Sequence, residues 1–101
     1  MELMNLSQSN FQENIENGNW LLQFWSSWCG PCIDTKHLEE FQLVSPGITV
    51  ARINSEENQD LSARYSVNVV PTYILFKKGN PTKRLVGLQT KETLRDLITS
   101  D

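Results

Sequence analysis

The sequence predicts an α/β fold in which helices cover both faces of a β-sheet. Two apolar segments, Trp20–Trp25 and Ile48–Asn54, have the length and composition of strands, and a segment with helical periodicity separates them. Strands joined in this way pair in parallel through a right-handed crossover. Two more strand-like segments, Thr72–Lys77 and 82–87, flank the turn sequence KGNP at 78–81 and predict a β-hairpin. The expected order of elements is (β)αβαβαββα.

The first part of the chain contains one weak strand, one helix and one buried strand. Residues Met1–Asn5 are expected to form a short edge strand. A capping-box pattern, in which Ser9 is followed by Gln12, predicts a first helix over Asn10–Asn17. The segment WLLQFW at Trp20–Trp25 is short, apolar and rich in aromatic residues, which is typical of a buried strand.

The rest of the chain adds three helices. Apolar residues recur at helical spacing over Pro31–Val44, and a Pro-Gly pair follows them, so the second helix is expected to end there. A short third helix is expected to begin near Asn58. Thr90 is the expected cap of a last helix, whose apolar stripe consists of Leu94, Leu97 and Ile98.

Length and composition favour one acidic domain over residues 1–101. A chain of this size buries roughly 60–70% of its unfolded surface on folding. Its net charge of −3 and pI near 5.1 argue against a nucleic-acid or anionic-membrane partner, since either requires a clustered basic face. The first residues, MELMNLSQSNFQENIENG, lack the basic start and apolar run of an export signal. We therefore expect a cytoplasmic protein without membrane spans.

Both cysteines lie in the segment WSSWCGPC, at Cys29 and Cys32. Such a pair can be a structural staple, two metal ligands, or a disulfide that opens and closes. A staple is disfavoured because cytosolic thiols are kept reduced, and because closing so short a loop removes little entropy from the unfolded chain. A metal site is disfavoured because structural zinc takes four ligands and His37 is the only histidine. A redox pair without a metal is the favoured interpretation.

The position of the pair predicts its chemistry. Cys29 follows the carboxyl end of a strand and is expected at the N-cap of the Pro31–Val44 helix. Unpaired N–H groups and the positive end of the helix dipole stabilise a thiolate there. Pro31 suits the first helical turn, where its missing N–H is not needed. Cys32 lies one turn further, where its thiol can attack a mixed disulfide formed on Cys29.

These motifs resemble the thioredoxin family. The matching segments run from about Phe11 to Ile98 and include FWSSWCGPC, VVPTY, KKGN and LVGL. The resemblance implies a thioredoxin fold, with a central mixed five-stranded sheet flanked by four helices in three layers. It also implies a monomer that reduces protein disulfides without a bound cofactor. Electrons would come from a thioredoxin reductase, which carries the NADPH and FAD chemistry on the partner.

The same resemblance implies a role for each residue of the site. Cys29 would be the attacking thiol and Cys32 the resolving one. Pro71 would be a cis proline facing the disulfide, and Val70 would offer its backbone N–H and C=O to an extended substrate. The active-site loop would contain Trp28, Gly30 and Pro31. The other wall of a shallow apolar groove would consist of Val86, Gly87 and Leu88.

Several positions depart from the family pattern. Gln23 stands where the family usually has a buried aspartate that relays a proton, and Arg52 stands where it has a lysine. Our hypothesis is that Arg52, or a water bonded to Gln23, replaces the relay, because a nearby cation favours a thiolate. His37 replaces a helix-kinking proline, so a straighter second helix is expected. A lone helical histidine is itself expected to be a packing or surface residue.

Two alternatives to a general reductase remain open from the sequence. The Gln23 substitution is compatible with a specialised thiol oxidoreductase that has a narrow substrate or a different electron donor. The fold can also serve as a non-catalytic binding subunit whose groove holds a partner. Turnover of insulin disulfides distinguishes the enzymes from the binding subunit.

Overall fold

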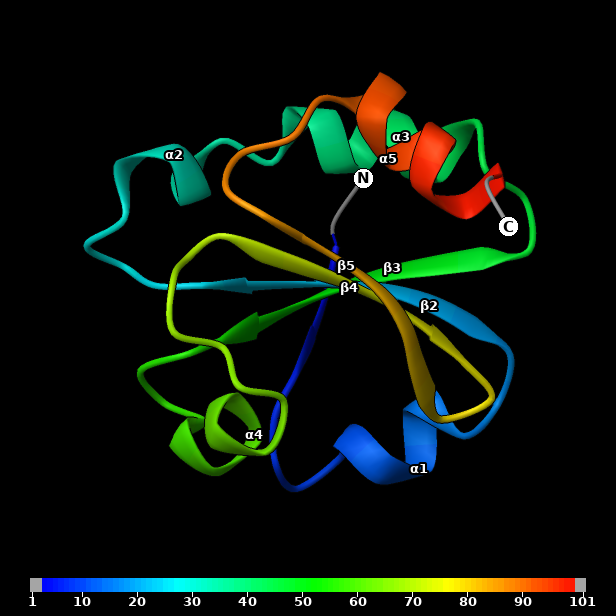
Figure 1. Cartoon of the computed structure of the whole chain (residues 1–101). Coiled ribbons are helices and arrows are strands. Elements are labelled where there is room, and N and C mark those ends of the chain that lie inside the picture. Colours follow the sequence, from blue (N-terminus) through cyan, green and yellow to red (C-terminus); the bar gives the residue numbers. More distant parts are fainter. Residues whose placement is uncertain (1–2, 100–101) are drawn as a thin grey trace.

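The computed structural model describes residues 3–99, which form a five-stranded sheet between two layers of helices (Figure 1). The spatial order of the strands is β1-β3-β2-β4-β5. The first three strands in this order are parallel, and β4 and β5 are each antiparallel to the preceding strand. The mixed sheet, the β-α-β unit and the hairpin are thus confirmed. The strands are β1 (Met4–Leu6), β2 (Asn19–Trp25), β3 (Ile48–Asn54), β4 (Thr72–Lys77) and β5 (Asn80–Val86).

Helices α1 and α4 cover one face of the sheet, and α3 and α5 cover the other (Figure 1). The short helix α2 lies on the side of α3, near one end of the sheet (Figure 1). Residues 3–99 therefore contain five helices, where four were expected. The helices are α1 (Phe11–Ile15), α2 (Gly30–Ile33), α3 (Lys36–Leu43), α4 (Gln59–Arg64) and α5 (Lys91–Thr99).

The additional helix arises because the expected Pro31–Val44 helix is broken in two. Asp34 has an extended backbone, with ψ 114°, and its Oδ1 accepts a hydrogen bond of 2.9 Å from the N–H of Lys36. Short acidic side chains compete in this way with helical hydrogen bonds. The prediction of a straighter helix was therefore wrong, because the break at Asp34 does not depend on the proline that His37 replaces.

The ends of the first two elements differ from the sequence prediction. Strand β1 extends to Leu6 and pairs with β3, while Met1 and Glu2 of the expected strand lie outside the described residues. Helix α1 begins at Phe11, and the expected capping box is absent. Its serine, Ser9, instead bonds the hydroxyl of Ser7 at 2.8 Å.

The hairpin turn is shorter than predicted. Lys78 and Gly79, with φ of 51° and 86°, form a two-residue turn of the kind that matches strand twist. Strand β5 therefore begins at Asn80, two residues before the expected start, and includes Pro81. Pro81 pairs with Phe76 beside a register irregularity in β4, which is where a residue without an N–H is tolerated.

Alternating side chains of the central strands divide the core into two layers. Residues such as Leu22, Phe24 and Phe76 pack beneath α1 and α4, and Leu21 and Tyr73 pack beneath α3 and α5. This alternation follows from the two-residue period of a strand.

Candidate active site

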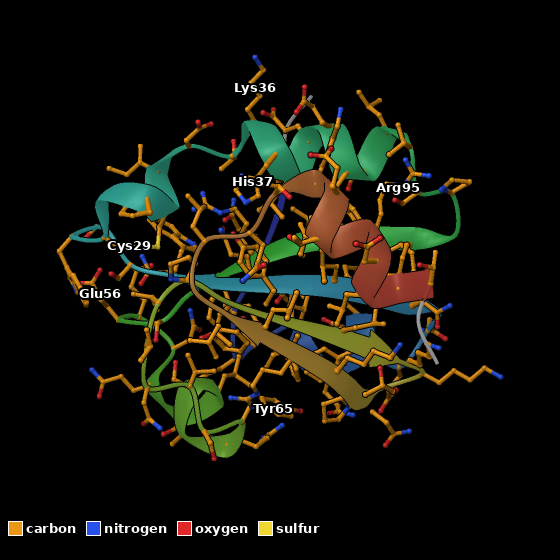
Figure 2. The ribbon with its side chains drawn as sticks, turned by 45° about the horizontal axis from the view of Figure 1, so that its top comes forward. Cys29, Lys36, His37, Glu56, Tyr65 and Arg95 are labelled. Atoms are coloured by element: carbon orange, nitrogen blue, oxygen red, sulfur yellow. A yellow bond between two sulfur atoms is a disulfide. The ribbon has the colours of Figure 1, made fainter. Side chains whose placement is uncertain are left out.

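The two cysteines lie just past the carboxyl end of β2 and form a disulfide (Figure 2). Their Cα atoms are 5.3 Å apart, and the Cys32 N–H donates to the Cys29 carbonyl at 3.1 Å. Cys29 is the N-cap of α2 and is 6% exposed, whereas Cys32 is completely buried. Trp28 beside them is 74% exposed, as a residue of a contact surface would be. The pair can therefore be approached from solvent only at the Cys29 side.

Helix α2 is a single turn, so the long helix dipole expected behind Cys29 is not present. Stabilisation of a Cys29 thiolate is still expected, because the effect of a helix N-terminus comes mainly from the unpaired N–H groups of its first turn. Pro31 occupies that first turn, where its missing N–H leaves no donor unsatisfied.

The loop before the cysteines is held by a residue that the sequence did not indicate. Glu56 follows the end of β3. Its Oε1 accepts two hydrogen bonds from Ser27, one from the backbone N–H at 2.7 Å and one from the hydroxyl at 2.8 Å. Figure 2 shows Glu56 on the same side of the molecule as Cys29. The hydrogen bonds between Glu56 and Ser27 connect the loop to the end of β3. The only sign of them in the sequence was an acidic residue after the strand that neighbours β2.

The expected groove residues lie together around a cis peptide bond. The Val70–Pro71 bond is cis, and the Pro71 carbonyl accepts a hydrogen bond of 2.8 Å from the N–H of Gly87. Gly87 has a φ of +89°, which a residue with a side chain adopts only with strain. Within residues 3–99 the backbone polar groups of Val70 have no hydrogen-bond partner. Exposed apolar side chains of these segments are Val69, Val86 and Leu88, and those beside the cysteines are Trp28 and Ile33.

Next to Cys32 lies a partly buried polar network, made of Arg52, Gln23, Tyr73 and His37. Strand register places Gln23 opposite Arg52 of β3 on one side and Tyr73 of β4 on the other. Arg52 Nε donates to Gln23 Oε1 at 2.8 Å, and Gln23 Nε2 donates to the Tyr73 hydroxyl at 3.2 Å. The same hydroxyl lies 2.8 Å from His37 Nε2.

Arg52 also contacts the active-site helix directly. Its Nη2 donates to the carbonyl of Cys32, and its guanidinium lies 4.3 Å from the ring centroid of Trp25. The break at Asp34 leaves the Cys32 carbonyl without a helical partner, and Arg52 supplies one. Gln23 and Arg52 are thus adjacent, as the family pattern implies, and Arg52 reaches the backbone of Cys32.

Burial sets the direction of each pKa shift in the network. It lowers the pKa of His37, with a smaller lowering from Arg52, while the nearby carboxylates of Asp34 and Glu40 raise it less strongly. Burial also lowers the pKa of Arg52. It raises the pKa of Tyr73 by more than the Gln23 side chain, the Gln89 backbone and the charge of Arg52 lower it.

The lowered pKa of His37 makes folding stability depend on pH. The unfolded chain binds a proton at His37 near pH 6.5, above the folded pKa, so stability from this group is present above pH 6.5 and is lost as pH falls through the folded value. We expect His37→Gln to lose less stability than the parent between pH 7 and pH 5. Urea unfolding of both proteins at several pH values measures this, and parallel curves would contradict it.

Sequence reasoning placed His37 as a packing or surface residue and did not identify Tyr73 as a polar partner. The structure shows His37 half-buried on α3 and bonded to Tyr73 of β4, so the packing interpretation omitted its hydrogen bond. Nothing local signals this contact, because 36 positions separate the two residues.

Residues 3–99 contain neither an arrangement for metal binding nor a helix that could span a membrane. In this part of the chain, no group of three or more His, Cys, Asp or Glu side chains is arranged to hold a metal ion. None of the helices within the same residues is long and apolar enough to cross a membrane.

Known proteins match almost the whole chain. A sequence model of the family Thioredoxin matches residues 2–100. Curated relatives include a thioredoxin of Chlamydia pneumoniae, 43% identical and covering 92% of each chain. Another is a thioredoxin of Staphylococcus haemolyticus, 37% identical and covering 97% of this chain and 96% of that one. A solved structure of a mutant thioredoxin from Halobacterium salinarum has a TM-score of 0.82 and 33% identity, covering 94% of this chain and 86% of that chain. With a Cys-Gly-Pro-Cys disulfide at the end of β2, the chain therefore belongs to the thioredoxin family of dithiol–disulfide oxidoreductases.

Proposed function

We propose that this chain reduces protein disulfides with Cys29 as the nucleophile and Cys32 as the resolving thiol. The observation that carries the proposal is the disulfide itself, whose first residue is 6% exposed and whose second is completely buried. A substrate reaches Cys29, whereas Cys32 is placed to react only with Cys29.

The reaction is two successive thiol–disulfide exchanges. The Cys29 thiolate attacks one substrate sulfur, a Cys29–substrate bond forms, the substrate disulfide breaks, and the other substrate sulfur leaves as a thiolate that takes up a proton. Cys32 then loses its proton to solvent and attacks the Cys29 sulfur. The internal disulfide forms, and the second substrate thiolate leaves. Two electrons pass from the dithiol to the substrate.

The groove around the cis peptide bond is the proposed substrate site. The unpaired N–H and C=O of Val70 are available to an extended substrate segment, in the manner of strand addition. Backbone pairing depends little on the side chains of the substrate. The exposed Trp28, Val86 and Leu88 add apolar contacts of low selectivity. This arrangement favours many protein substrates over one.

Regeneration requires an external reductant, because each turnover leaves the chain oxidised. We assign this role to a thioredoxin reductase that uses NADPH and FAD on its own chain, as the family membership suggests. A cytoplasmic setting suits such a cycle, since thiols are kept reduced there.

Reduction of insulin disulfides, coupled to NADPH and a thioredoxin reductase, tests the proposal. The parent is expected to turn over, and its NADPH consumption measures the rate. A parent that binds insulin without reducing it would instead favour the non-catalytic binding subunit. Turnover with dithiothreitol but not with the reductase would point to a different electron donor.

We also propose that Arg52 partly replaces the missing aspartate in helping Cys32 to lose its proton. Its cation, held at the Cys32 carbonyl, favours the thiolate that Cys32 forms during resolution. Gln23 cannot titrate, and its amide orients Arg52 through the 2.8 Å hydrogen bond. The proton of Cys32 then leaves through solvent or through a water bonded to Gln23.

Replacing Gln23 by aspartate is expected to change the pH profile of disulfide reduction. The new carboxylate would pair with Arg52 and offset its charge, so the Cys32 thiolate would be less favoured and the rate below neutral pH would fall roughly tenfold. Steady-state insulin reduction between pH 5.5 and 8.5 measures this. Gln23→Asn, which adds no charge, is the control, and an Asp variant with the parent's rate and pH profile would refute the proposal.

A further inference from the structure

The chemistry at one end of the partly buried polar network determines the direction of every hydrogen bond in it. Arg52 can only donate, so Gln23 Oε1 is the acceptor and the Gln23 amide nitrogen must donate to the Tyr73 oxygen. Among the hydrogen bonds of residues 3–99, the only other partner of the Tyr73 hydroxyl is His37 Nε2. A buried hydroxyl proton needs an acceptor, so the tyrosine proton is directed to His37 Nε2, 2.8 Å away.

We propose that His37 is a positioning residue for the exchange reaction, and that its neutral Nε2 completes a one-way network holding the Arg52 guanidinium at the carbonyl of Cys32. The imidazole proton must then be on Nδ1. The inference rests on the proposed function, because Cys32 is the resolving thiol only in that scheme. His37 does not touch the sulfurs and acts through Tyr73, Gln23 and Arg52.

Protonation of His37 would reverse the last hydrogen bond. An imidazolium Nε2 is a donor, so the Tyr73 oxygen would accept from both His37 and Gln23, and its own proton would lose its acceptor. A buried polar group without a partner is unfavourable, so Tyr73 or Gln23 would have to move. Gln23 is one of the three contacts that hold Arg52, and a shift of its amide loosens the guanidinium beside Cys32.

The surroundings of His37 allow it to exchange protons while keeping it neutral near pH 7. Figure 2 shows His37 on α3, beside the segment that leads into α5. It lines a cleft of about 550 Å³ that includes Leu88 of the proposed substrate groove. Burial, which lowers its pKa, outweighs the two carboxylates that raise it. The charged or titratable groups that face it are Asp34 and Glu40, Arg52 of β3, Tyr73 of β4, and Lys91 and Glu92 of α5.

Nuclear magnetic resonance of the imidazole nitrogens in the oxidised full chain tests the network without any turnover. At pH 7.5 we expect the proton on Nδ1 and an accepting Nε2. Tyr73→Phe removes the donor to the neutral ring and is expected to raise the pKa of His37. Tyr65→Phe, which removes a tyrosine hydroxyl on the opposite face of the sheet, is the matched control and should leave that pKa unchanged.

Kinetics test the effect on the exchange reaction. Stopped-flow measurement of the resolving step should show a fall of roughly threefold to tenfold in His37→Leu, which corresponds to the loss of one hydrogen bond. His37→Gln offers a neutral acceptor and is expected to recover most of the rate. The parent should also slow as pH falls from 7 to 5, with an inflection at the measured pKa of His37 that His37→Gln lacks.

The outcomes separate this inference from the function on which it rests. A proton on Nε2 at pH 7.5, or a resolving step in His37→Gln with the parent's inflection, would overturn the role of His37 while leaving the reductase activity intact. A parent that reduces no disulfide would refute the proposed function, and with it the role of His37 in exchange. The expected tautomer together with rescue by glutamine supports the proposal.

Discussion

Replacing Cys32 by serine is expected to abolish turnover in insulin reduction and to leave the chain covalently joined to its substrate. Cys29 can still attack a disulfide, because it remains the partly accessible member of the pair, at 6% exposure. The mixed disulfide then persists, since a serine hydroxyl at position 32 cannot displace the substrate sulfur. Non-reducing gels and mass spectrometry should show a disulfide-linked complex that dithiothreitol cleaves.

Cys29→Ser is the matched control for this experiment. It removes the nucleophile and keeps Cys32, which is completely buried, so neither turnover nor a trapped complex is expected. Unchanged insulin reduction in Cys29→Ser would refute the assignment of the two thiols. The partners trapped on Cys32→Ser in a cell extract show in addition whether the substrates are many or few.

The largest expected loss of stability comes from replacing Phe76 by alanine. Phe76 is completely buried in β4, with its ring 5.8 Å from that of Phe11 of α1 and 5.1 Å from that of Tyr65, at the end of α4. Its removal leaves a cavity where two helices meet the sheet. Such a change costs about 3–5 kcal/mol, a large part of the roughly 5–15 kcal/mol that stabilises a domain.

Urea unfolding followed by circular dichroism measures this loss. Phe76→Leu keeps most of the volume and is the matched control, with an expected cost of about 1.5 kcal/mol or less. An alanine variant that loses under about 1 kcal/mol would show that the rings of Phe11 and Tyr65 close the cavity. Because β4 begins directly after Pro71, we expect the alanine variant also to weaken the proposed groove.

The sequence alone predicted the features that depend on residues close together in the chain. The Cys-Gly-Pro-Cys segment identified the redox pair, because one turn of helix brings Cys29 and Cys32 together wherever the segment lies in the fold. Thr90 was correctly predicted as a helix cap, and its Oγ1 accepts the N–H of Thr93 at 3.1 Å. The β-α-β order predicted parallel pairing, since crossover handedness leaves few alternatives.

Predictions from sequence patterns were wrong where two local signals competed. The apolar periodicity over Pro31–Val44 indicated one helix, but the side chain of Asp34 takes the N–H of Lys36 and breaks it. At Ser9 the capping pattern was present, yet the helix begins at Phe11 after a different cap, Asn10. At Asp34 a short polar side chain decided the outcome, and periodicity does not record such contacts.

By itself the sequence determined the disulfide chemistry and the layered sheet, whereas only the tertiary structure decided what surrounds Cys32. Arg52, Gln23 and Tyr73 are brought side by side by the register of three strands, and His37 joins them from a helix 36 positions away from Tyr73. The physical reason is that a buried donor requires an acceptor, and the strands and helix that meet at that point determine which residue provides it.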